Sequence, residues 1–105
     1  MSVEDFRSLY ERHVGHIVSG NMKAALADMV PENLPQVFDG VDTPRAEVRS
    51  HRIADVRAEG DLMIGEAVYE LDDRTIGLRS YWEQRDGRWL AGRLENFDVE
   101  KDVRA

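Results

Sequence analysis

The 105-residue chain contains no cysteine, which excludes disulfide bonds, thiolate nucleophiles and sulfur ligands for metals. It also lacks any apolar run close to the roughly 20 residues that a membrane-spanning helix needs. The stretch 1–5 has neither the basic nor the apolar region of a secretory signal. These absences predict a cytoplasmic protein that does not associate with membranes.

Positive charge is also scarce, since 14 basic residues face 21 acidic ones and give a net charge of -7. Nucleic-acid binding needs a concentrated basic surface, and the arginines here are scattered, so we expect no nucleic-acid partner. The three histidines show no convincing metal-ligand spacing, and we expect neither a metal nor another cofactor. The length predicts a single domain over 1–105 with one core.

The first third of the sequence predicts two helices. Apolar residues recur at spacings of three and four through 3–17, and Ser2 is a suitable N-cap. Gly20 suits the left-handed position that ends a helix, and Asn21 can cap a second helix over about 22–29. Both helices present an apolar face that needs a covering partner.

The next segment is broken by Pro31 and Pro35. We expect at most a short strand at 37–38. The stretch 43–45 can begin a single helical turn, because its proline would occupy the first helical position.

The remaining half predicts four strands, over about 48–58, 62–71, 75–84 and 88–98. Their short connections favour antiparallel pairing in sequence order, as a meander. The last connection contains Asp86-Gly87, which tolerates the positive φ of a tight hairpin turn.

Apolar residues occur on both faces of two of these strands. In the second strand Ile64 and Val68 oppose the face of Tyr69, and in the fourth Trp89, Ala91 and Phe97 oppose Leu90 and Leu94. Two helices can cover only one face of the sheet, so we expect a homodimer joined through the other face.

The order of these features resembles the nuclear transport factor 2-like superfamily, which includes SnoaL-like polyketide cyclases and ketosteroid isomerases. The motifs that carry the resemblance are 19–21, 59–61 and 86–89, and it covers about 3–98. It implies an α+β cone: two N-terminal helices packed on a curved four-stranded antiparallel sheet. It also implies a cavity for a small molecule and frequent homodimers.

Two residues are catalytic candidates by this resemblance. His13 falls where ketosteroid isomerases place an oxyanion-hole tyrosine, and Asp39 lies about two residues from their base aspartate. The second oxyanion donor falls near Arg79 or Ser80, which cannot act as a protonated carboxylic acid, so steroid isomerisation itself is not expected. From the residues alone, His13 is a core residue, a pocket residue or an acid–base catalyst.

Tyr10, His13, Tyr69 and Trp82 suit an apolar pocket with a few oriented polar groups, although aromatic residues at this spacing also suit a core. The first functional hypothesis is a protein that binds a small apolar molecule, with isomerase, cyclase or hydratase chemistry left open. The alternative is a non-catalytic dimerisation or accessory module whose cone is filled by side chains.

Overall fold

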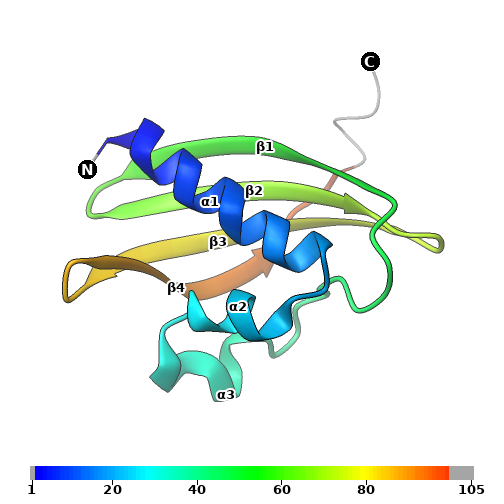
Figure 1. Ribbon diagram of the computed structural model, residues 1–105, viewed down its shortest axis with the longest axis horizontal. Coiled ribbons are helices and arrows are strands. Elements are labelled where there is room, and N and C mark those ends of the chain that lie inside the picture. The colour runs from blue at the N-terminus through cyan, green and yellow to red at the C-terminus, as the bar shows by residue number, and fades with distance from the viewer. Residues whose placement is uncertain (1, 100–105) are drawn as a thin grey trace.

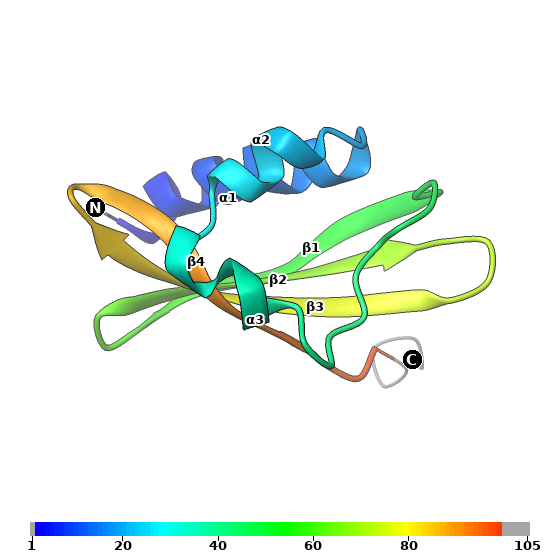
Figure 2. The same cartoon turned by 90° about the horizontal axis from the view of Figure 1, so that it is seen from below.

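A computed structural model of the chain describes residues 2–99 and has two layers, helices on one face of an antiparallel sheet (Figure 2). The main elements are α1 (Val3–Val18), α2 (Met22–Ala27), β1 (Ser50–Glu59), β2 (Leu62–Glu70), β3 (Thr75–Arg85) and β4 (Arg88–Asn96). The strands pair in the order β1-β2-β3-β4, and α1 crosses their inner face (Figure 1). The predicted α+β meander is therefore confirmed. None of the helices within 2–99 is long and apolar enough to span a membrane.

The predicted start of each helix and the end of α1 near Gly20 are confirmed, whereas α2 ends at Ala27 and not at about residue 29. The Ser2 hydroxyl accepts a hydrogen bond from the backbone N–H of Asp5, whose carboxylate accepts one from the Ser2 backbone. Gly20 has a φ of 80°, and the Asn21 side chain accepts from the backbone N–H of Ala24. These local bonds satisfy N–H groups that would otherwise lack partners at the two helix starts.

Between α2 and β1 the structure corrects two expectations. The expected strand at 37–38 is wrong, because a short 3-10 helix, Pro31–Asn33, leads into a single helical turn, α3 (Leu34–Val37). Each proline lies at a first or second helical position, where its missing N–H breaks no hydrogen bond. The residues 43–45 are not helical.

A bulge in β4 corrects the predicted face of its second half. Tyr81 pairs with Arg93 but Trp82 pairs with Ala91, so Gly92 is an extra residue in this strand. An extra residue reverses the alternation beyond it. Leu94 therefore packs against the core cluster, and Phe97 lies by the backbone of Gly77, where the guanidinium of Arg79 stands over its ring.

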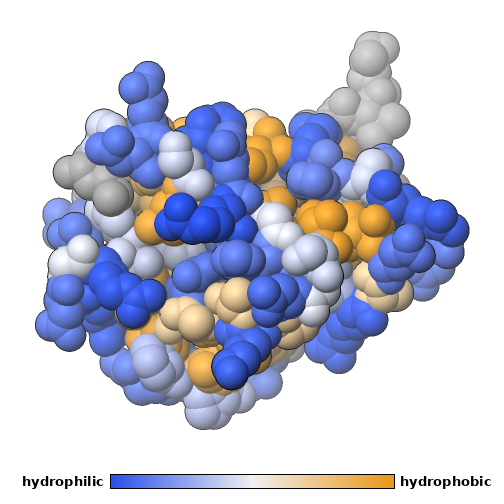
Figure 3. All heavy atoms as spheres, viewed as in Figure 1, coloured by the Kyte–Doolittle hydropathy of each residue, from blue (hydrophilic) through white to orange (hydrophobic). Residues whose placement is uncertain are grey.

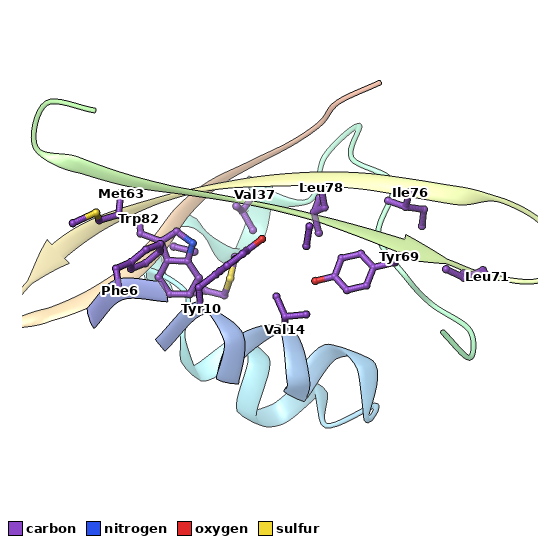
Figure 4. Packing of buried hydrophobic residues seen from close by; sticks show 13 residues of the cluster. Phe6, Tyr10, Val14, Val37, Met63, Tyr69, Leu71, Ile76, Leu78 and Trp82 are labelled. Carbon is purple, nitrogen blue, oxygen red and sulfur yellow. The ribbon is translucent and has the colours of Figure 1, made fainter. Parts of the chain in front are cut away.

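The core lies between α1 and the inner face of the sheet, and Figure 4 shows its side chains meeting there. Phe6 is edge-on to Trp82 with ring centroids 5.4 Å apart, and both side chains are fully buried. The Tyr10 ring covers Gly65, where an added Cβ would lie 2.5 Å from the Tyr10 Cζ atom. The space between α1 and the sheet is thus filled by aromatic rings at this point.

The outer face of the sheet is covered mainly by charged side chains. Arg79 donates to Glu66 at 2.6 Å and to Glu95 at 2.5 Å, and Arg57 also contacts Glu66 at 3.2 Å. We call Arg57, Glu66, Arg79, Tyr81, Arg93 and Glu95 the outer network. The apolar Ile64 and Val68 have exposures of only 1% and 3% in a single chain.

Candidate functional site

An apolar crevice opens between α1, α2 and the segment 38–44, above β3 and β4. Its lining residues are His13, Ile17, Met22, Ala25, Leu26, Met29, Phe38, Thr43, Pro44, Leu78 and Leu94. Met22 and Leu26 are 45% and 37% exposed, so apolar side chains reach solvent on α2. Figure 3 shows small hydrophobic areas among hydrophilic residues over α2, and a broader hydrophobic patch beside the end of α1.

The crevice holds a cavity of only about 40 Å³. Ligand pockets usually have volumes of roughly 300–1,000 Å³, so a whole drug-sized molecule does not fit. A short aliphatic molecule, or the apolar end of a longer one, matches this space better.

His13 is the titratable residue of the crevice lining. Its side chain comes from the inward face of α1, is buried, and stands edge-on to Trp82 with ring centroids 5.0 Å apart. The Nδ1 atom of His13 lies 2.9 Å from Oδ2 of Asp28. An ionised carboxylate only accepts hydrogen bonds, so Nδ1 is the donor of this pair, and a neutral ring then has Nε2 as an acceptor.

The partner of His13, Asp28, was not predicted from the sequence. It is the C-terminal cap of α2, and its backbone oxygen accepts a hydrogen bond from the N–H of Ala91 in β4. The next residues continue this contact, because the N–H of Val30 donates to the Ala91 oxygen at 2.8 Å. A strand therefore fixes the position of the carboxylate, and no local sequence motif signals a link of this kind.

The other candidates occupy different places. Asp39 is exposed and is not among the crevice residues, although its neighbour Phe38 is. His16 is partly buried near the end of α1, and His51 is exposed on β1. Of the two predicted catalytic candidates, only His13 lies in the crevice.

Tyr10, Tyr69 and Trp82 belong to the core cluster, with exposures of 3% or less, and they are not among the crevice residues. Tyr10 and Trp82 pack around His13, since the Tyr10 and His13 ring centroids are 6.4 Å apart. Figure 4 shows the hydroxyl groups of Tyr10 and Tyr69 pointing toward each other. Burial raises the pKa of both hydroxyls above 10.0, so both are neutral at physiological pH. These positions give the three aromatic residues a packing role around the candidate site.

Within residues 2–99, no group of three or more histidine or acidic side chains is arranged to hold a metal ion. The site therefore offers one imidazole–carboxylate pair beside an apolar crevice. Such a pair can accept a hydrogen bond or a proton from a bound molecule.

No family model matches the sequence, and no curated protein matches it. Comparison with solved structures finds an NTF-2 like protein of unknown function from Burkholderia xenovorans LB400, known from a crystal structure. The two share 14% sequence identity and a TM-score of 0.59, over 97% of this chain and 95% of that chain. At this identity the likeness concerns the fold, and it agrees with the helices and the four-stranded meander described above. The chain therefore has the nuclear transport factor 2-like fold.

Proposed function

We propose that this chain is a binding domain for a small apolar molecule, or for the apolar end of a longer one. The observation that carries the proposal is the crevice itself, whose lining is apolar except for His13 and Thr43. Pockets of this kind bind apolar groups through burial and orient them with one or two polar atoms. His13 would accept a hydrogen bond from a ligand hydroxyl at Nε2 while Asp28 holds Nδ1.

Acid–base catalysis would be an extension of this role. Isomerase, cyclase and hydratase reactions need a proton acceptor and a group that stabilises the developing charge. His13 could be the acceptor, and the hydroxyl of Thr43 is the remaining polar group of the lining. Binding is thus better supported than catalysis, because the lining offers only one base and one hydroxyl group for these two catalytic roles.

Substitutions that fill the crevice test the binding role. Ala25 is buried on the crevice side of α2, so Ala25→Leu should occupy the space of the ligand, whereas Ala27→Leu adds the same group at an exposed position of the same helix. In a calorimetric or NMR titration with cyclohexanol and butanol, we expect binding by the parent chain and Ala27→Leu, and its loss in Ala25→Leu.

A second variant, Leu26→Gln, changes the exposed rim without adding volume and should weaken binding of the same alcohols. Equal affinity in all four proteins, or no saturable binding by any of them, would reject the proposal. The Trp82 indole resonance reports whether each variant keeps its core.

The second candidate function is assembly with a second copy of the chain, in which the interior of the domain is filled by side chains and holds no ligand. The small cavity volume favours it, as does the aromatic filling by Phe6, Tyr10 and Trp82. In this case we propose a homodimer through the outer network. Its contacts would be polar, since Ile64 and Val68 are already covered within one chain.

A further inference from the structure

A second hollow lies outside the core, between α1 and the hairpin that joins β3 to β4. Its volume is about 210 Å³, and its lining residues are Leu9, Arg12, Asp28, Gly87, Arg88 and Trp89. It shares none of these with the apolar crevice. We call it the arginine groove.

The two arginines of this groove differ from most others in the chain. Arg12 and Arg88 are exposed, and the side chain of neither makes a hydrogen bond or an ion pair within residues 2–99. Arginines with a carboxylate partner include Arg7, Arg49, Arg57, Arg74, Arg79, Arg85 and Arg93. In a chain with an excess of acids, two arginines without acidic partners at one hollow indicate a local preference for anions.

The remaining polar groups of the groove leave room for an anion. Asp28 is the acidic residue of the lining, and its Oδ2 accepts a hydrogen bond from Nδ1 of His13, so two guanidinium groups face one carboxylate and the positive charge of the lining is in excess. Trp89 forms part of the wall, and its indole N–H is buried without an acceptor among the described residues. A buried donor without a partner is costly.

We propose that the arginine groove binds a small organic anion, with a carboxylate or phosphate group on an aromatic or aliphatic body. The guanidinium groups of Arg12 and Arg88 would donate to the anionic oxygens, because planar guanidinium groups match carboxylate and phosphate geometry. Leu9 and Trp89 would contact the apolar body. The lining of this site shares no residue with the crevice, although Asp28 of the groove bonds to His13 of the crevice, and neither proposal requires the other.

The two tryptophans make the test selective. The indole N–H of Trp82 donates to the Ser80 hydroxyl at 2.8 Å in the core, whereas Trp89 lines the groove. In an NMR titration with phenyl phosphate, we expect a saturable shift of the Trp89 indole signal and little change in that of Trp82. Phenol, which has the same ring without the anionic group, should bind much more weakly. Inorganic phosphate should bind more weakly than phenyl phosphate, because it lacks the apolar body.

Variants assign the binding to the groove. Arg12→Gln and Arg88→Gln should each raise the Kd for phenyl phosphate about tenfold, which corresponds to the loss of one charge-assisted interaction. Arg7→Gln is the matched control on α1, because Arg7 lies on an exposed position and pairs with Glu11 at 3.5 Å. It should leave the Kd unchanged. The proposal is overturned if Trp89 shows no saturable shift, if phenol binds as well as phenyl phosphate, or if the double variant Arg12→Gln, Arg88→Gln responds like the parent chain.

Discussion

The imidazole of His13 in α1 and the carboxylate of Asp28 at the end of α2 are joined by a contact of 2.9 Å between Nδ1 and Oδ2. The side chain of His13 is 6% exposed and that of Asp28 is 27% exposed, so the pair connects the core to the surface. Because the backbone of Asp28 is bonded to β4, the contact also ties α1 to the edge of the sheet. The candidate site and the stability of the helical layer therefore depend on the same pair.

The first prediction concerns the two histidines of α1. His13→Ala removes a buried ring and leaves Asp28 without its partner, so the free energy of unfolding should fall by about 2–4 kcal/mol. His16→Ala alters a partly exposed side chain and should cost less than about 1 kcal/mol. Denaturant unfolding of both variants provides the comparison. A larger loss of unfolding free energy for His16→Ala than for His13→Ala would contradict the observed buried face of α1.

The second prediction concerns the contact between Tyr10 and Gly65. Gly65→Ala would place a Cβ 2.5 Å from the Tyr10 ring, which is held by the surrounding core, and should destabilise the chain by about 1–3 kcal/mol. Gly15→Ala is the control, since an added Cβ there meets no atom within 4 Å. In a helix it should stabilise by about 0.5–1 kcal/mol. If thermal unfolding shows that both substitutions change the stability in the same direction, this packing is refuted.

The third prediction concerns acid stability and the outer network. Hydrogen bonds from Tyr81 and then Arg79 lower the pKa of Glu95 below the ordinary value of 4.5. A lowered pKa in the folded state gives stability that is present above pH 4.5 and is lost as the pH falls through the folded value. Glu95→Gln should therefore be less stable than the parent chain at neutral pH, and the difference should shrink in acid.

Glu47→Gln is the control for this pH dependence, because Glu47 is exposed and lies outside the outer network. Its free energy of unfolding should differ little from that of the parent chain at every pH. If the loss of unfolding free energy caused by Glu95→Gln stays constant from neutral to acidic pH, the ionised carboxylate of Glu95 does not stabilise the fold.

Most of the fold could be predicted because its signals are local. Ser2, Asn21 and the turn at 86–87 each act on neighbouring backbone groups, and the alternation in β2 placed Ile64 and Val68 on the face opposite Tyr69. The errors have non-local causes. The bulge at Gly92 is set by pairing with β3, and it moved Leu94 and Phe97 to faces opposite to those predicted.

The candidate site was harder to predict than the fold. The apolar pattern of α1 placed His13 near the core, but its partner depends on how α2 ends against β4. Asp39 was suggested by a resemblance in register, and the structure leaves it exposed beside α3. The unpaired arginines of the groove could not be recognised, because the absence of a partner becomes visible only in three dimensions.

The fourth prediction concerns the dimer. The expectation from sequence rested on exposed apolar residues, yet Ile64 and Val68 are covered in one chain, so a dimer would be held by the outer network and weakened by salt. Light scattering at micromolar concentration should give twice the chain mass of 12.0 kDa at low salt. Arg93→Glu should weaken the dimer and Arg45→Glu, outside that network, should not. If light scattering gives the mass of a single chain at every concentration and salt level, the dimer is excluded.

The most direct test of the binding proposal is the state of the His13 ring nitrogens, measured by NMR at a pH where imidazole is neutral, with and without cyclohexanol. We predict that Nδ1 carries the proton donated to Asp28, that Nε2 is bare, and that the Nε2 signal shifts on saturation with the alcohol. The same titration on Ala25→Leu should leave that signal unchanged. A proton on Nε2 in the free protein, or a His13 ring that does not respond to the alcohol, would contradict the assignment of the crevice as the binding site.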